Sequence, residues 1–328
     1  MKVSYAQRLE DYHLDLVFEG VARGVYVDVG GGHPVADNVS FHFYLKGWRG
    51  LVVEPQRALA QLYRSIRPRD SVVDCPVGDR DGEVSFHRVE RLHGFSTIVE
   101  EHARSAGEYG VTYETENRML RRLTGLLDEH GFSQIDFLKI DVEGAEGAVL
   151  AGLDLSRHRP RVLCIEAVRP GNMADVSGEW EPGLLAAGYA LAFQDGLNRF
   201  YVAHEFKELA LRFPSEPAPW DCVTHLYEFG HAGTDAGHPD YALAQRLITG
   251  LLASLPDLPA GFLRGLLEKS AGEGGIERGP ALRALLHGTA DFPRKGLHAV
   301  PDDPLPLDDA ARAALGRIAA AYDGGMIF

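Results

Sequence analysis

The sequence has few of the features that mark several classes of protein. Its 328 residues hold 33 Lys and Arg against 47 Asp and Glu, so the formal net charge is -14. No long basic tract interrupts this acidic background, which argues against a nucleic-acid partner because phosphate backbones are bound by clustered Lys and Arg. The only cysteines are Cys75, Cys164 and Cys222, without CxxC spacing. We therefore expect reduced thiols in a reducing compartment.

Long apolar runs are also missing. No stretch reaches the roughly 18–20 apolar residues that a membrane span needs. The N-terminus, MKVSYAQRLEDYH, carries charge where a signal peptide is apolar. The sequence therefore predicts a cytoplasmic protein with no membrane span.

Short apolar runs alternate with helix-compatible segments over the first two thirds of the chain. Five such runs lie at 25–29, 50–55, 71–78, 135–144 and 161–168. Alternation of this kind predicts an α/β fold with a doubly wound parallel sheet. Two further runs, 189–195 and 199–205, are separated by a few turn residues, which is the spacing of an antiparallel hairpin.

Beyond about residue 206 the pattern becomes helical. Segments 241–255, 261–269, 281–288 and 308–322 each show an apolar face with helical spacing. The sequence thus predicts a catalytic domain over 1–229, a Gly- and Pro-containing linker over 230–240 and a helical extension over 241–328. The apolar faces of the extension require burial, either as a cap on the active site or in a homo-oligomer.

A glycine-rich turn follows the first predicted strand. Gly30, Gly31 and Gly32 let backbone approach a ligand closely, although tight strand-to-helix turns also need glycine for structural reasons. Glu54 ends the second strand, where a carboxylate can accept both ribose hydroxyls of a nucleoside. Both S-adenosylmethionine and NAD present such hydroxyls.

Two residues near this turn favour S-adenosylmethionine. The motif is DVGGGHP, and Pro34 interferes with the immediate helix entry that cradles a pyrophosphate in GxGxxG proteins. Asp28 adds a carboxylate that suits an ammonium and a sulfonium but repels a diphosphate.

The fourth strand carries several acidic residues at its carboxyl end, where open α/β sheets bind ligands. In IDFLKIDVEGAE, period-2 alternation places Lys139, Asp141 and Glu143 on one side. Asp141 and Glu143 are candidates for a catalytic base or for ligands of a divalent cation such as Mg²⁺, and Glu166 near the end of the fifth strand is a further catalytic candidate. Alternatively, Glu143 and Glu146 begin the next helix, and Glu166 pairs with a nearby arginine such as Arg161 or Arg169.

Other candidates for the reaction lie on turns. His33 beside the glycine turn has the unperturbed pKa of a general base, or else it caps the turn. The predicted substrate contacts are Trp180, which can stack on a sugar, and Asp195, Asn198 and Arg199 in the hairpin. A tight hairpin needs Asp, Gly and Asn for structural reasons, and an aromatic residue can simply pack under a loop.

The chain resembles FkbM-type methyltransferases, the variety often found beside glycosyltransferases. The resemblance covers most of residues 3–225 and rests on ordered blocks, among them SYAQRLED (4–11), VYVDVGGGHPVADNVSFHFYLKGWRGLVVEP (25–55), GFST (94–97), IDFLKIDVEGAEGAVLAGLDL (135–155) and DGLNRFYVA (195–203). It implies a Rossmann-like class I methyltransferase sheet, S-adenosylmethionine as donor, and O-methylation of a hydroxyl on a sugar, glycan or secondary metabolite.

The matching blocks also imply roles for individual residues. Asp28 and the turn at Gly30 and Gly31 would hold the methionine end of the donor, and Glu54 its ribose. The remaining implied cofactor contacts are Val77, Gly78 and Asp79 around the adenine, with Gln7, Ser96 and Asp141. The sequence departs from the family at Gly31 and Gly32, where Ala and Asn are more common, and at Cys75, which is commonly Ala.

Two other functions remain open at this level. A catalytically weak scaffold subunit of a biosynthetic complex would keep the cofactor fold and act through its helical third, although Asp28, Glu54 and Asp141 are intact. A nucleotide-dependent oxidoreductase is disfavoured by the missing GxGxxG motif.

Overall fold

The computed structural model describes residues 1–89, 93–105, 107, 110–169, 173–270 and 307–325. They form two compact units, one made of Met1–Gly230 together with Asp308–Phe328 and the other of His231–Leu307. The second unit is therefore an insertion in the sequence of the first.

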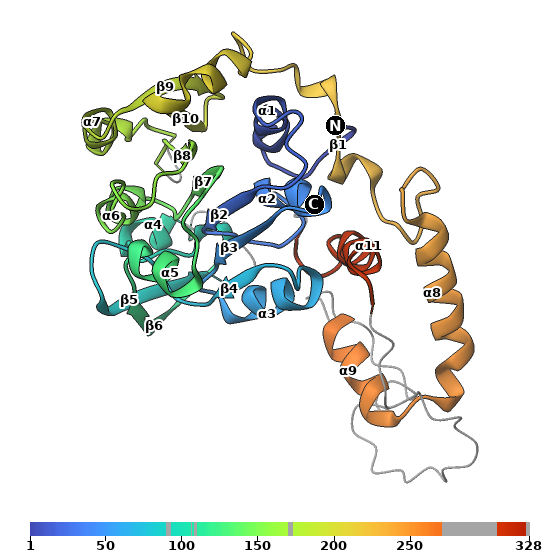
Figure 1. The fold of residues 1–328 in the computed structure, drawn as a ribbon. Coiled ribbons are helices and arrows are strands. Elements are labelled where there is room, and N and C mark those ends of the chain that lie inside the picture. The colour runs from blue at the N-terminus through green and yellow to red at the C-terminus, as the bar shows by residue number, and fades with distance from the viewer. Residues whose placement is uncertain (90–92, 106, 108–109, 170–172, 271–306, 326–328) are drawn as a thin grey trace. The chain divides into compact units, whose positions relative to one another are not determined.

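A seven-stranded sheet forms the centre of the first unit (Figure 1). In spatial order its strands are β4 (Ser71–Val73), β3 (Arg49–Val53), β2 (Val25–Val29), β7 (Phe137–Ile140), β8 (Val162–Glu166), β10 (Asn198–Ala203) and β9 (Tyr189–Gln194). The first five run parallel, and β10 is antiparallel to both β8 and β9. The mixed α/β fold with a mostly parallel sheet, predicted from the sequence, is confirmed.

Both faces of this sheet are buried, because successive side chains of a strand point to opposite sides. Tyr26, Val52 and Phe137 belong to an apolar cluster that includes residues of α1 (Glu10–Val17), α2 (Val39–Leu45) and α3 (Arg57–Ile66). Val27, Leu51 and Leu138 belong to a second cluster with residues of α5 (Leu123–His130), α6 (Glu146–Ala151) and α7 (Glu181–Ala186). Burial on both sides explains the continuous apolar runs in the sequence.

The strand order reverses between β2 and β7. From β2 the chain moves outward to β3 and β4, then returns to β7 on the other side of β2. Open α/β sheets bind ligands at the carboxyl ends of strands beside such a reversal. The topology therefore directs attention to the residues that follow β2, β3 and β7.

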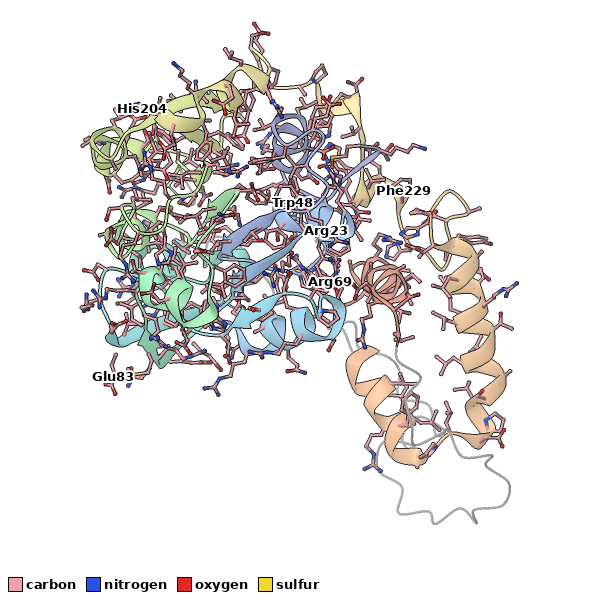
Figure 2. The ribbon with its side chains drawn as sticks, in the orientation of Figure 1. Arg23, Trp48, Arg69, Glu83, His204 and Phe229 are labelled. Carbon is pink, nitrogen blue, oxygen red and sulfur yellow. The ribbon has the colours of Figure 1, made fainter. Side chains whose placement is uncertain are left out.

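A separate two-stranded antiparallel sheet, β5 (Gly82–Val89) with β6 (Tyr113–Leu120), was not predicted from the sequence. Between its strands lie the short helices η1 (His93–Phe95) and α4 (Glu100–Ser105). Charged residues give these strands no apolar run; Arg88, for example, pairs across the strands with Glu114 at 2.5 Å and Glu116 at 3.2 Å. The exposed Glu83 lies on this hairpin (Figure 2).

The remaining elements are small or helical. In the first unit β1 (Val3–Ser4) pairs in parallel with β11 (Thr224–His225). The second unit contains α8 (Tyr241–Ser254) and α9 (Ala260–Ser270), while the helix expected over 281–288 lies outside the described residues. None of the helices in the described ranges combines the length and the apolar composition needed to cross a membrane.

The last helix, α11 (Asp309–Ala319), belongs to the first unit and not to the helical extension expected over 241–328. It contacts α3, where Ala313 and Gly316 are buried. Asp309 pairs with Arg69 at 2.5 Å, and Arg312 donates to the Ser65 carbonyl at 2.7 Å; Figure 2 shows Arg69 beside this helix. The periodicity of the sequence revealed an apolar helix face, but it did not reveal which unit covers that face.

Replacing Gly316 with leucine is expected to destabilise the first unit. A Cβ atom at this position would lie 3.0 Å from side-chain carbons of Ile66 and Val35, so a larger side chain overpacks the contact. We expect Gly316→Leu to lower the free energy of unfolding by about 1–3 kcal/mol, measured by urea denaturation. The control Gly183→Leu, in α7 with open space at its Cβ, should be neutral or gain up to about 1 kcal/mol. Equal midpoints for the two variants would contradict this packing.

Candidate functional site

A cavity of about 260 Å³ opens at the carboxyl ends of β2, β3 and β7. Its walls come from the segments after these strands and from residues 94–98. Among the residues named from the sequence, the cavity is lined by Gln7, Gly30, Gly31, His33, Glu54, Val77, Ser96, Asp141 and Glu143. The position agrees with the reversal of strand order at β2 and β7.

The glycine turn is fixed by close backbone packing. Gly30 has a φ of 77°, and a Cβ there would overlap the carbonyl oxygen of Asp141. A Cβ on Gly31 would lie 2.7 Å from the Tyr63 hydroxyl. The amides of Gly30 and Gly31 both donate to the Val53 carbonyl, at 2.9 and 3.2 Å. Only glycine fits the first of these positions without a backbone shift.

Glu54 lies at the edge of this turn and is 2% exposed. Its carboxylate accepts hydrogen bonds from the backbone amides of Gly32 at 2.8 Å and Gln56 at 2.7 Å. Burial raises the pKa of Glu54 to about 7, and the two amide hydrogen bonds oppose the rise. A buried carboxylate with further lone pairs facing a cavity is suited to accept hydrogen bonds from ligand hydroxyls.

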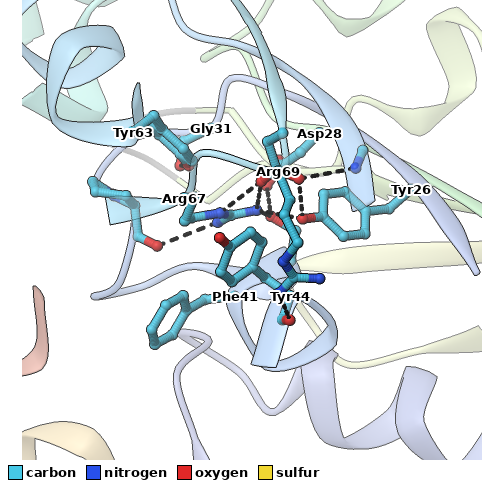
Figure 3. Close-up of polar contacts among 12 residues, drawn as sticks. Tyr26, Asp28, Gly31, Phe41, Tyr44, Tyr63, Arg67 and Arg69 are labelled. Atoms are coloured by element: carbon cyan, nitrogen blue, oxygen red, sulfur yellow. Dashed lines mark hydrogen bonds and ion pairs between the residues drawn. The ribbon is translucent and has the colours of Figure 1, made fainter. Parts of the chain in front are cut away.

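Asp28 has a different place from the one expected. It is buried, does not line the cavity, and accepts a hydrogen bond from the Ser40 hydroxyl at 2.5 Å. Ser40 in turn accepts from Arg67, a fully buried residue that also donates to Asn38 at 2.9 Å. Figure 3 shows Asp28, Arg67 and Tyr26 within one group of polar contacts. The side chain of Asp28 therefore supports the glycine turn from the protein interior.

Lys139 connects the turn to the acidic side of the cavity. Its ammonium donates to the Gly30 carbonyl at 2.9 Å, pairs with Asp141 Oδ2 at 3.0 Å and lies 3.9 Å from Asp28 Oδ1. Lys139 lines the cavity, although the sequence had suggested only that it shares a side with Asp141. This residue fixes the orientation of the Asp141 carboxylate.

Three acidic residues named from the sequence come together. One oxygen from each of Asp141, Glu143 and Glu166 lies within 4.8 Å of the others. We call these residues the acidic cluster. Burial raises the pKa of Glu143 and of Glu166 well above the usual range, and the neighbouring carboxylates add to the rise. Glu166 pairs with no nearby arginine in the described part of the chain, contrary to the alternative reading.

The turn that carries Glu143 is strained and held on several sides. Glu143 has a φ of 57°, in the left-handed region that non-glycine residues avoid. Its carbonyl accepts hydrogen bonds from Thr97 Oγ1 at 3.0 Å and His102 Nδ1 at 2.8 Å. Glu146 accepts from the amides of Val142 and Gly144, as expected of an acid at the start of a helix. Strain of this kind is typical of functional sites.

His33 is engaged at both ring nitrogens. Nδ1 accepts from the amides of Val35 and Ala36, at 3.2 and 3.1 Å, and Nε2 lies 3.2 Å from Asp323 Oδ1. Because Nδ1 must carry the lone pair, the proton resides on Nε2 and is donated to Asp323. These contacts agree with the alternative, in which His33 caps the turn.

The predicted adenine wall is only partly present. Val77 lines the cavity together with Cys75 and Phe86, whereas Gly78 and Asp79 do not reach it. Ser96 lines the cavity, and its hydroxyl accepts from the Val89 amide at 3.0 Å. Phe86, Phe95, Thr97 and Ile98 also line the cavity but were not named as site residues from the sequence, because the hairpin that carries Phe86 and encloses the other three was not foreseen.

The four residues predicted to bind substrate do not line this cavity. Trp180 is buried against Tyr201, with ring centroids 5.8 Å apart. Asp195 closes the hairpin by accepting from the amides of Leu197 and Asn198. The Asn198 side chain donates to Glu10 at 2.8 Å, and Arg199 pairs with Asp175 and Glu181. The contacts of Asp195, Asn198 and Arg199 agree with the structural alternative for the hairpin.

Comparison with known proteins gives one match. The family model of the methyltransferase FkbM domain matches residues 28–191, which contain the glycine turn, Glu54 and the acidic cluster. No curated protein and no solved structure gave a match. Since the matched segment is half of the chain and includes every residue that lines the cavity except Gln7, the chain belongs to the FkbM methyltransferase family.

Proposed function

We propose that this methyltransferase uses S-adenosylmethionine to methylate a hydroxyl group of a sugar, glycan or secondary metabolite. One observation carries the proposal: a single cavity joins a glycine turn with the Glu54 carboxylate to a side lined by Asp141 and Glu143. The first side suits a nucleoside donor and the second a hydroxyl acceptor. The strand order, with β10 antiparallel between β8 and β9, supports a Rossmann-like class I methyltransferase sheet.

The residues present fit the donor. The turn at Gly30 and Gly31 brings backbone to the cavity wall, Glu54 offers carboxylate oxygens to ribose hydroxyls, and Val77 with Phe86 offers apolar surface to a base. Gln7 and Ser96 add polar groups from segments outside the sheet. When bound, S-adenosylmethionine supplies a methyl carbon on a positively charged sulfur. The nearby carboxylates favour that charge.

The chemistry asked of the protein is alignment and removal of one proton. The acceptor oxygen forms a bond to the methyl carbon while the bond from that carbon to sulfur breaks and its electron pair stays on sulfur. The hydroxyl proton passes to Asp141, whose carboxylate is held in place by Lys139. Glu143 lies beside it and orients the acceptor through hydrogen bonds from further hydroxyls.

The charge of the site favours a neutral acceptor rich in hydroxyl groups. Three carboxyl groups of the acidic cluster face one ammonium, that of Lys139. Carboxyl groups exchange hydrogen bonds with hydroxyls, and any that are ionised repel phosphate or carboxylate groups on a ligand. Sugars and polyketide-type hydroxyls meet this requirement.

The experiment that tests the proposal is calorimetric titration of the protein with S-adenosylhomocysteine. We expect saturable binding with one site per chain. Glu54→Ala should weaken it at least tenfold, since it removes a charged acceptor worth about 1.5–3 kcal/mol per hydrogen bond. Glu83→Gln, an exposed acid on the hairpin, is the control and should bind like the original protein. Absence of binding, or equal binding by Glu54→Ala, would refute the donor site.

The raised pKa of Glu54 predicts that the stability of the fold and the affinity for the donor change in opposite directions with pH. Its pKa is about 7 in the fold against an ordinary value of 4.5, so the folded state holds the proton more tightly. The stability from this group is complete below pH 4.5 and is lost as the pH rises through 7. The loss is about 3 kcal/mol, because each pH unit between the two values contributes about 1.4 kcal/mol. The ionised form is the better acceptor, so affinity for S-adenosylhomocysteine should rise up to about pH 7.

Urea denaturation of the ligand-free protein at pH 5 and pH 8 measures the expected loss of stability with rising pH. Glu54→Gln should show a smaller loss of stability over this interval than the original protein, whatever its absolute stability. Parallel pH profiles for the two proteins would show that Glu54 does not titrate in this range.

Asp141→Asn should impair methyl transfer more than donor binding. The amide keeps the size of the side chain but cannot take the proton, which typically costs about 10²–10⁴ in kcat. Methyl transfer from labelled S-adenosylmethionine to a panel of glycosides and polyketides measures kcat, and titration measures donor affinity. Full activity of Asp141→Asn would exclude it as the proton acceptor.

A further inference from the structure

The acidic cluster gathers more buried carboxyl groups than the described residues pair with cations. Asp141, Glu143 and Glu166 bring one oxygen each within 4.8 Å, and Lys139 contacts only Asp141 among them at 3.0 Å. Glu146 is close in sequence, but its Oε1 atom is satisfied by two backbone amides. Buried carboxylates are costly unless they are paired or coordinate a metal.

In the described part of the chain, Glu166 is the member of the acidic cluster with an unpartnered carboxylate oxygen. The residue is 8% exposed, and its Oε2 atom is buried without any hydrogen-bond partner among the described residues. Buried polar atoms are nearly always hydrogen-bonded, so an unpartnered carboxylate oxygen on a member of the acidic cluster indicates a missing positive partner. This observation is independent of the clustering itself.

The geometry points to a divalent cation bound by Asp141, Glu143 and Glu166, and we propose Mg²⁺ or Mn²⁺ as the occupant. Oxygen ligands at about 2.0–2.6 Å from one ion lie roughly 3–5 Å from each other, which matches the observed separations. Three carboxylates and no nitrogen or sulfur ligand suit a hard cation, with water or substrate completing the coordination.

The ion would reach this site from the cavity. Asp141 and Glu143 line the cavity, and the Asp141 side chain is 30% exposed, so two of the three ligands are accessible. The strained turn at Glu143, held through its carbonyl by Thr97 and His102, fixes one ligand before the ion binds. A preorganised ligand lowers the cost of ordering the site on binding.

The site would give the cation a role at the acceptor, and this part of the inference rests on the proposed function. A hydroxyl oxygen of the acceptor would complete the coordination, so that its pKa falls and its proton is released more readily. Two neighbouring hydroxyls could bind together, which would select acceptors with vicinal hydroxyls.

Calorimetric titration with MnCl₂ and, separately, MgCl₂ tests the site directly. The full-length protein is first treated with EDTA and exchanged into chelator-free buffer. We expect one saturable site per chain, weakened at least tenfold in Glu166→Gln, a substitution that keeps the side-chain size. Glu83→Gln is the control and should bind the ion unchanged. Asp141→Asn is the second variant if Glu166→Gln does not fold, as judged by circular dichroism.

The outcomes separate this inference from the proposed function. Absence of saturable binding, or equal binding by Glu166→Gln, overturns the cation site, and the methyltransferase proposal stands if S-adenosylhomocysteine still binds. Cation binding without S-adenosylhomocysteine binding supports the site and refutes the donor. Cation binding together with loss of methyl transfer in EDTA, restored by Mg²⁺ or Mn²⁺, supports both.

Discussion

The position of the Lys139 ammonium governs the arrangement of the whole site. Burial opposes the charged form, but the carboxylates of Asp141 and Asp28 raise the pKa of Lys139 above its ordinary value. The ammonium thereby joins β7 to the turn after β2, the two strands between which the strand order reverses. Without this charge the Asp141 carboxylate would lose its partner and the Gly30 carbonyl its donor. The glycine turn and the acidic side of the cavity therefore depend on the same group.

The fold was largely predictable because its signals are local. Continuous apolar runs mark strands that are buried on both faces, and the short spacing before Asn198 marks the hairpin of β9 and β10. The hairpin of β5 and β6 was not predictable in this way, since its strands are rich in charge and distant in sequence. The packing of α11 against α3 was also not predictable from the sequence. Periodicity shows that a helix has an apolar face but not which element packs against that face.

Candidate site residues were predictable from the sequence at positions where the residue type rarely has a purely structural role. The acids Asp141, Glu143 and Glu166 stand at the carboxyl ends of buried strands. Burying a carboxylate there is unfavourable unless a cation or hydrogen bonds compensate for it. His33 and Asp195 stand in turns, where the same residue types serve as caps, and Asn198 begins β10 and donates to Glu10. Sequence alone could not separate these cases, because the hydrogen-bond partners that decide them, such as Asp323 and Glu10, lie far away in the chain.

The pairing of His33 with Asp323 has a consequence for how the protein is made. The two residues are 290 positions apart, with the whole second unit between them. A chain emerging from the ribosome can form the central sheet early, but His33 beside the glycine turn lacks its contact with Asp323 until synthesis has passed the inserted unit. The contact between His33 and Asp323 therefore forms only after the inserted unit has been translated. A chain that terminates earlier would lack this contact.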